Sequence, residues 1–156
     1  MDKLKNLIAL GVYENSDMLL IPEESTGGRP QSPFATYKIS TIAKGMGDRI
    51  TKYKEAGEEF KRTDSVTLNT TLSINVYGDE EKALQVYDYF KLFGLDTLRT
   101  EGYVIESIQG FGNRDFLQTD KIVNRIGFDV IIRSEHTIEQ VTEWIESYTI
   151  TEKQEG

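Results

Sequence analysis

The chain has 156 residues, of which 38% are hydrophobic and 28% are charged, and these proportions predict a globular protein with a buried core. Its formal net charge of −8 and its lack of a basic block argue against non-specific DNA binding, which needs clustered lysine and arginine. The absence of cysteine excludes disulfides and thiolate chemistry. No apolar run approaches the roughly 20 residues that a membrane span requires.

The first third of the chain predicts a helix, a loop, a strand and a charged hairpin. Apolar side chains at helical spacing predict an amphipathic helix over residues 2–13, which Asp2 would cap. Residues 23–33 form a loop by composition, because prolines and a glycine pair lie in or beside them. This glycine pair lacks the spacing and the following helix of a phosphate-binding loop. Residues 34–42 are rich in β-branched and aromatic side chains, which predicts a strand.

Glycines at positions 45 and 47 predict a break in the chain, and a charged segment follows it. Arg49–Thr63 predicts a β-hairpin with its tip near Gly57. Because the hairpin holds little apolar area, we expect it to project from the body. It is either solvated surface or an arm that contacts a neighbouring subunit.

Residues 66–77 carry the clearest pattern in the chain, a strict alternation of apolar and polar side chains that Thr70 alone interrupts. This alternation predicts a long central strand with one face on the core. The other face carries only hydroxyls, amides and Tyr77, which suit contact rather than catalysis. The apolar positions are Val66, Leu68, Leu72, Ile74 and Val76, and the polar positions before Tyr77 are Thr67, Asn69, Thr71, Ser73 and Asn75.

Asp79 is positioned to cap a helix over residues 80–93, whose apolar residues recur at helical spacing up to Gly94. A strand signal follows at 103–108. Residues 112–119 then combine charged and aromatic side chains in what we predict to be an interface loop. Residues 122–133 alternate again and predict the second long strand, the best partner for residues 66–77.

Near the C-terminus, Thr137-Ile138-Glu139-Gln140 fits a capping box and predicts a helix that reaches Tyr148. An extended conformation of residues 148–150 competes with this helix. The fold class expected from these elements is α/β (α+β), with one mixed or mostly antiparallel sheet of about four long strands, helices packed on it and a projecting hairpin. We expect one domain over residues 1–150, followed by a flexible tail at 151–156.

The residue types give no support to catalysis. His136 is the only histidine, and no nucleophile motif flanks it. The sequence has no histidine–cysteine cluster for zinc and no loop with the spacing of calcium ligands. Distant carboxylates can converge into a hydrolase site, but nothing here favours that outcome. We therefore expect a protein that is not an enzyme and that uses no metal or cofactor.

Four segments, taken in order, carry a resemblance to a known family: residues 33–39, the strand-to-helix junction Tyr77–Ala83, Asn113-Arg114-Asp115 and the strand Asn124–Arg133. Together they resemble the neck or tail terminator proteins of tailed bacteriophages and of phage-tail-like bacteriocins derived from contractile tails. The resemblance covers about residues 4–133. It does not extend to the charged hairpin or to the chain after Glu135.

The resemblance implies a small α/β subunit that forms a ring, commonly a hexamer, on the end of the tail tube. Such a ring (a collar or neck structure) stops tube polymerisation and offers a docking surface to the head. The implied partners are further copies of the chain and the tail tube protein, with the sheath and head-side connector as additional candidates. No membrane or specific nucleic acid is implied. The implied location is the tail or neck of a virion or tail-like particle, assembled in the host cytoplasm.

We assign ring or tube contacts to polar-aromatic residues that are too poor in apolar area to be core. Arg114, Asp115, Arg125 and Asp129 either pair between subunits or pair with neighbours in their own sheet. One alternative function is a head–tail joining protein that binds the portal or an adaptor, and another is a monomeric or dimeric ligand-binding α/β domain with an apolar pocket. The candidate interface residues are Arg49, Lys52, Tyr53, Lys54, Phe60, Lys61, Arg62, Arg114, Asp115, Phe116, Arg125 and Asp129.

Overall fold

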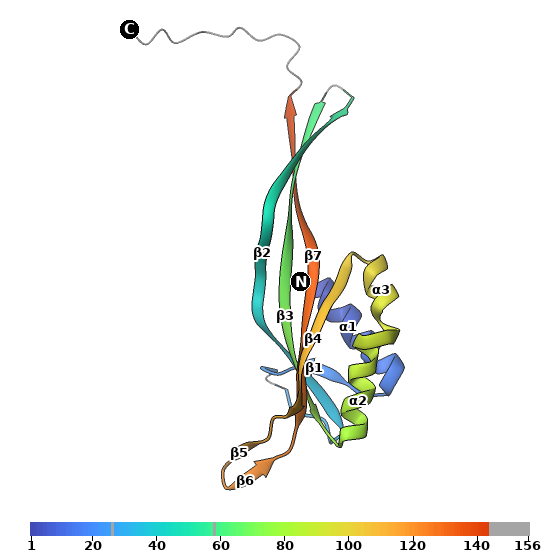
Figure 1. Cartoon of the computed structure of the whole chain (residues 1–156), viewed down its shortest axis with the longest axis vertical. Coiled ribbons are helices and arrows are strands. Elements are labelled where there is room, and N and C mark those ends of the chain that lie inside the picture. The colour runs from blue at the N-terminus through green and yellow to red at the C-terminus, as the bar shows by residue number, and fades with distance from the viewer. Residues whose placement is uncertain (26, 58, 144–156) are drawn as a thin grey trace, which may run out of the picture.

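The computed structural model describes residues 1–25, 27–57 and 59–143, which form a long sheet with helices on one side (Figure 1). The fold is α+β with a mixed sheet, as the sequence predicts. The elements in chain order are α1 (Asp2–Ser16), β1 (Leu20–Pro22), β2 (Phe34–Ala56), β3 (Glu59–Tyr77), α2 (Glu80–Asp88), the π-helical turn η1 (Tyr89–Phe93), α3 (Leu95–Thr100), β4 (Tyr103–Asn113), β5 (Phe116–Gln118), β6 (Lys121–Val123) and β7 (Ile126–Glu143).

The main sheet has the strand order β1-β2-β3-β7-β4. Only β1 and β2 are parallel, and the other neighbours are antiparallel. The prediction that residues 66–77 form the central strand is confirmed, and they pair with β7 as expected. The bounds predicted for that partner, residues 122–133, are wrong, because residues 122–123 belong to β6 and β7 continues ten residues past Arg133. A separate two-stranded sheet joins β5 to β6.

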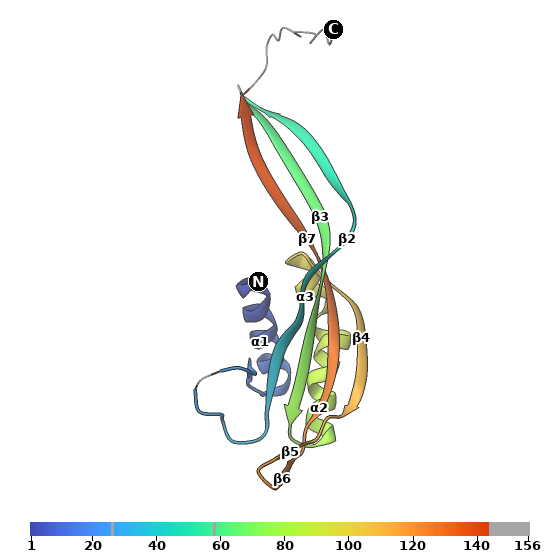
Figure 2. The same ribbon diagram turned by 90° about the vertical axis from the view of Figure 1, so that its left-hand side faces the viewer.

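Three strands continue well past the helices and form a narrow extension, seen from two sides in Figures 1 and 2. We call residues 49–56 of β2, 59–65 of β3 and 137–143 of β7 the arm, and the rest of the described chain the body. The predicted hairpin at residues 49–63 is thus the end of two long strands, with a turn at Gly57. β7 adds a third strand along it. The β5–β6 hairpin projects from the opposite end of the molecule.

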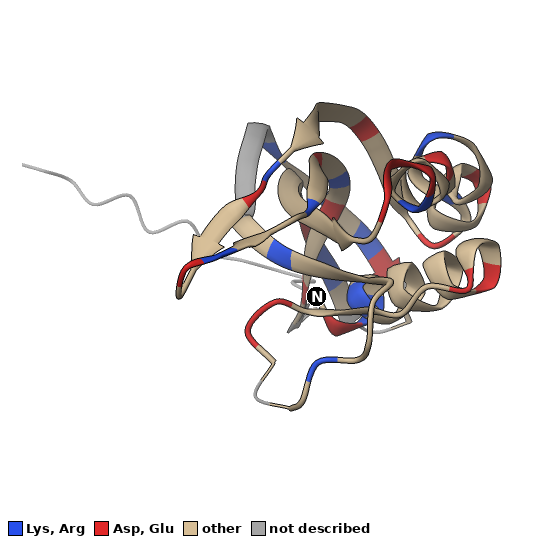
Figure 3. Ribbon diagram, turned by 90° about the horizontal axis from the view of Figure 1, so that it is seen from below, with Lys and Arg blue, Asp and Glu red and all other residues tan. Residues whose placement is uncertain are grey.

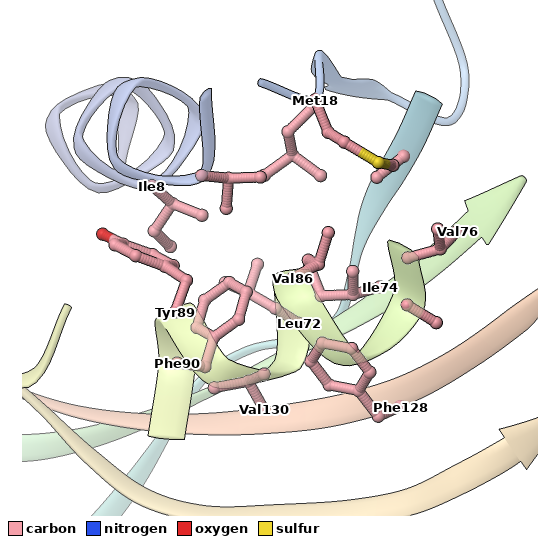
Figure 4. Packing of buried hydrophobic residues seen from close by; sticks show 14 of the residues in the cluster. Ile8, Met18, Leu72, Ile74, Val76, Val86, Tyr89, Phe90, Phe128 and Val130 are labelled. Atoms are coloured by element: carbon pink, nitrogen blue, oxygen red, sulfur yellow. The ribbon is translucent and has the colours of Figure 1, made fainter. Parts of the chain in front are cut away.

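The core lies between the helices and the apolar face of the body sheet (Figure 4). Leu4, Ile8 and Val12 recur every four residues on α1 and are all buried. They meet side chains of β3 and β7, among them Leu72 and Phe128. Each such aliphatic or aromatic burial contributes roughly 1.5–3 kcal/mol to stability. The helices therefore cover the apolar face of the central strand, while no helix lies on its polar face (Figures 1 and 2), where Asn75 and Tyr77 are buried by other elements.

The second helical region departs from the single helix predicted for residues 80–93. Asp79 caps α2 as predicted, because its carboxylate accepts the Lys82 N–H at 2.8 Å. The chain then widens into the π-helical turn η1, in which the adjacent residues Tyr89 and Phe90 are both buried. A regular α-helix turns about 100° per residue, so the extra residue in this turn helps to direct two consecutive rings inward. The ring of Tyr89 lies in a space that a side chain at Gly11 would fill.

Four further local predictions are wrong, and backbone pairing or geometry explains each. The capping-box pattern at residues 137–140 does not start a helix, because those residues pair with residues 62–65 of β3 as part of β7. The remainder of that predicted helix, residues 144–148, lies outside the described residues. Asp2 does not cap the first helix, because it lies inside the first turn of α1 and Met1 is the N-cap. The chain does not break at Gly45 and Gly47, because β2 continues there through register shifts. The segment 112–119 is not one loop, because it contains the end of β4 and then β5.

Candidate assembly surfaces

Arg125 organises the end of the body from which the β5–β6 hairpin projects. Its Nε donates to the carbonyl oxygen of Arg114 at 2.7 Å, and its Nη1 lies 3.3 Å from the carboxylate of Glu23 and from the hydroxyl of Tyr77. Its guanidinium lies over the ring of Phe116, 4.4 Å from the centroid. The planar guanidinium supplies donors in a fixed fork, so one side chain ties the hairpin to the sheet and to the loop after β1.

Asp115 closes the base of the same hairpin. Its carboxylate accepts the backbone N–H of Arg125 at 2.9 Å, and its own N–H donates to the side chain of Asn113 at 2.7 Å. The backbone N–H of Arg114 donates to the carbonyl of Arg125 at 2.8 Å. These bonds join the two chain segments where they leave the main sheet, so the direction of the hairpin is fixed by the body.

Arg114 extends across the polar face of the sheet to the central strand. Its guanidinium donates to Ser73 at 2.9 Å and to Asp129 at 3.2 Å, and these two residues are register partners on β3 and β7. On its way the side chain passes over Gly127, where a Cβ would collide with it and with the backbone of β3. Glycine is therefore required at position 127 for this close approach.

The β5–β6 hairpin presents an apolar pair that the sequence analysis missed. Leu117 and Ile122 are register partners and are 71% and 70% exposed. Side chains directly opposite each other in an antiparallel pair lie on the same face, so the two form one apolar surface. Charges of both signs surround this end of the molecule (Figure 3). The surface therefore combines an apolar centre with a mixed polar rim.

The arm is held together by polar contacts on its two faces. The hydroxyl of Thr51 donates to Asp64 at 2.7 Å, and Arg62 lies 3.2 Å from the same carboxylate. The Thr51 hydroxyl and then the Arg62 guanidinium hold the pKa of Asp64 below its usual value, although partial burial opposes them. On the other face Lys61 pairs with Glu139 at 2.9 Å.

Apolar side chains on the arm lie open to solvent. Tyr53 is 61% exposed and Val141 is 58% exposed, while Ile50 and Ile138 are also exposed. No helix lies on this part of the sheet (Figure 2). The arm is thus a single-layer sheet, and such sheets need a covering partner for stability of their own.

The candidate interface residues fall into two groups at opposite ends of the molecule. The first group is Arg49, Lys52, Tyr53, Lys54, Phe60, Lys61 and Arg62 on the arm, and the second is Arg114, Asp115, Phe116, Arg125 and Asp129 at the base of the β5–β6 hairpin. In the second group the charges meet partners within the chain. Arg114 pairs with Asp129, and Arg125 pairs with Glu23.

Two sequence expectations, on metal ligands and on His136, can be compared with the described residues. Among these residues no group of three histidine, cysteine or acidic side chains is placed to hold a metal ion. His136 lines a groove of about 580 Å³ at the junction of arm and body, together with Leu68, Tyr103 and Glu101. Within the described chain its imidazole makes no hydrogen bond to a hydroxyl or a carboxylate. None of the described helices is long and apolar enough to cross a membrane.

The model of a family described as phage neck terminator protein matches residues 1–156. No curated protein matches the chain.

Proposed function

We propose a specific role in the phage neck on the premise that this chain belongs to the phage neck terminator protein family. Proteins of this family are structural, so the chain is a structural component of the phage tail and neck. The finer proposal is that copies of the chain form a ring on the end of the tail tube. This ring stops further polymerisation of the tube and gives the head a docking surface.

The observation that supports this proposal best is the pair of uncovered projections at opposite ends of the molecule (Figure 1). A ring on a tube needs lateral contacts between identical subunits and an axial contact with the tube. The arm has exposed side chains on both faces and suits the lateral contact. The β5–β6 hairpin has a compact apolar surface on a fixed base and suits the axial contact.

In this proposal Leu117 and Ile122 dock against the last ring of the tube protein. Burial of two aliphatic side chains that are about 70% exposed supplies an apolar centre, which is the usual source of binding energy at an interface. Arg125 and Asp115 act by positioning, because they hold the hairpin against the sheet before the partner arrives. Such preorganisation lowers the entropy cost of binding.

Deleting the chain from assembling particles tests the role itself. We expect tubes of irregular, excessive length in electron micrographs, because nothing occupies the surface to which the next tube ring adds. Tails of normal length that lack heads would instead indicate a joining protein that binds the portal or an adaptor. Particles with normal tails and heads would contradict both roles.

Substitution of the apolar pair tests the proposed tube contact. The variant Leu117→Asp/Ile122→Asp should keep its ring mass but lose binding to isolated tubes by at least about tenfold, since two desolvated contacts cost about 1.4 kcal/mol or more. Leu92→Asp is a matched control, because Leu92 is 63% exposed on η1, away from the hairpin. Equal tube binding by the double variant and the control would overturn this assignment.

A further inference from the structure

Both outer edges of the arm lack a partner strand within the described residues. β1 pairs with β2 only at residues 35–37, so the outer edge of β2 is open from Lys38 onward. On the opposite side, the pairing of β4 with β7 ends at Ser134, so β7 is open from Glu135 to Glu143. Each open edge presents unpaired backbone donors and acceptors along the arm.

The edge of β7 is unusually regular for an exposed strand. Its register with β3 runs without a shift from Glu143 to Ile126, and no proline interrupts it. Proteins commonly protect an exposed edge with bulges, prolines or a covering element, because a flat edge recruits another strand. β2 carries register shifts up to Ile50, beyond which its pairing is regular again. Two regular edges of similar length therefore flank the arm.

The two edges carry opposite charge on the same face of the arm. Lys52 and Glu139 both lie opposite Thr63 of β3, so the three side chains form one row across the sheet. Lys54, opposite Lys61, lies on that face two residues nearer the tip, and Glu135, opposite Thr67, lies on it four residues nearer the body. Neither Lys52 nor Lys54 makes an ion pair within the described chain. One edge of the face is thus basic and the other is acidic.

We propose that adjacent copies of this chain join by strand pairing between the outer edge of β7 in one copy and the outer edge of β2 in the next. β2 and β7 are both antiparallel to β3, so copies arranged side by side about a ring axis make a parallel junction. Between copies at the same height, the junction places Glu139, which also pairs with Lys61 of its own chain, beside Lys52 of the neighbour, with Lys54 at the diagonal position. Glu135 adds negative charge to the same edge. The partner is a second copy, and the proposal rests on the ring proposed above.

Charge complementarity selects this arrangement over a two-fold dimer. Pairing β7 with β7, or β2 with β2, would place like charges on neighbouring strands, which is destabilising. The β7–β2 junction is heterologous and leaves one open edge of each kind on every pair of copies. Such a contact repeats until it closes into a ring, and closure covers every arm edge.

Complementary charge reversal tests the junction. The variant Lys52→Glu/Lys54→Glu has two acidic edges, and the variant Glu135→Lys/Glu139→Lys has two basic edges. We expect each variant alone to lose rings by more than tenfold in native mass spectrometry. A mixture of the two should recover rings that contain both chains in equal number, because every junction in an alternating ring is again acidic against basic. Glu106→Lys on β4 and Lys91→Glu on η1 are controls that change the same charges away from the arm and should leave rings intact.

The outcomes distinguish a failure of the β7–β2 junction from a failure of the ring proposal. Rings formed by either reversed variant alone would overturn the edge pairing while leaving the ring itself intact. A wild-type chain that stays monomeric at all concentrations would overturn the ring and the junction together. A mixture that yields only dimers would support a two-fold contact and would contradict the repeating junction.

A milder variant controls for loss of folding in the charge-reversed variants. Lys52→Gln/Lys54→Gln removes the charges without adding repulsion, and circular dichroism should show an unchanged strand content. One direct and one diagonal charge contact at about 0.5 kcal/mol each predict a roughly fivefold rise in the concentration at which rings dissociate. An unchanged dissociation concentration would contradict the charge pairing.

Discussion

The body and the arm share three strands, β2, β3 and β7, yet they are stabilised in different ways. In the body, β3 and β7 bury Leu72, Ile74, Phe128 and Val130 beneath helices. In the arm, the same strands carry exposed apolar side chains and rely on polar contacts such as that between Thr51 and Asp64. The alternation of side chains continues along the strand, but the helical cover ends. The comparison shows that the arm, which no helix covers, is the part of the sheet available to a partner.

Core truncation should give the largest contrast between the two regions. Phe128 is fully buried and its ring meets those of Tyr87 and Phe90 at 5.5 and 5.8 Å. Phe128→Ala should lower the free energy of unfolding by about 3–5 kcal/mol, because it removes buried surface and leaves a cavity. Ile138→Ala on the arm should cost no more than about 0.5 kcal/mol, since half of that side chain is exposed. Chemical denaturation of the dissociated chain measures both, and equal losses would contradict the division between body and arm.

Loss of the Arg125 side chain should have an intermediate effect. Arg125→Ala removes the bonds to the Arg114 carbonyl and to Glu23, and it uncovers Phe116. We expect a loss of about 1–3 kcal/mol, in the range of hydrogen bonds to charged groups. Hydrogen exchange should also become faster in β5 and β6 than in the arm. A variant whose β5–β6 amides exchange as slowly as in the wild type would show that Arg125 does not position the hairpin.

The buried Tyr89 predicts a loss of stability at alkaline pH that originates in the body. Burial, and secondarily the charge of Glu14, raises the pKa of Tyr89 to about 12. The unfolded chain ionises this hydroxyl near pH 10, whereas the folded chain keeps it neutral, so stability falls as the pH rises from about 10 to 12. Allowing for screening by solvent, we expect a fall of about 1–2 kcal/mol. In Tyr89→Phe this contribution should vanish, and an identical pH profile in both proteins would contradict the assignment.

The smallest effect is expected for the polar contacts of the arm. Asp64→Asn removes the carboxylate that accepts from Thr51 and pairs with Arg62. Because the pKa of Asp64 is lowered in the folded chain, its contribution is present above the usual carboxylate range and is lost as the pH falls below that range, through the lowered pKa of the folded chain. At neutral pH we expect faster amide exchange at residues 50–54 with little change in the global denaturation midpoint. A shift of the midpoint as large as that of a core variant would place the arm within the main cooperative unit.

The sequence predicted those elements whose signals are local. The alternation of residues 66–77 and the cap at Asp79 depend on neighbouring residues alone, and the structure confirms both. The capping box at residues 137–140 gave a wrong prediction, because the conformation of these residues depends on pairing with β3, more than 70 residues earlier in the chain. The β5–β6 turn was missed because Thr119 and Asp120 adopt positive φ without glycine.

The candidate site was predicted as a set of residues but not as two surfaces. Polar-aromatic composition identified Arg114 and Arg125, but their partners are distant in the chain, and Glu23 lies 102 residues from Arg125. Leu117 and Ile122 could have been found from their symmetric positions, each two residues away from the turn residues 119–120. No local pattern shows that β7 runs beside the charged hairpin, so the opposite charges of the arm edges became apparent only from the register.

Hydrogen exchange along the outer edge of β7 tests the central claim most directly. The claim is that the bare arm gains its cover from neighbouring copies of the chain. In dissociated chains, outward-facing amides between residues 135 and 141 should exchange freely, because they have no strand partner. In assembled rings the same amides should exchange at least about tenfold more slowly, as should those of β2 from residue 50 to 55. Equally fast exchange of both edges in dissociated chains and in rings would contradict the account.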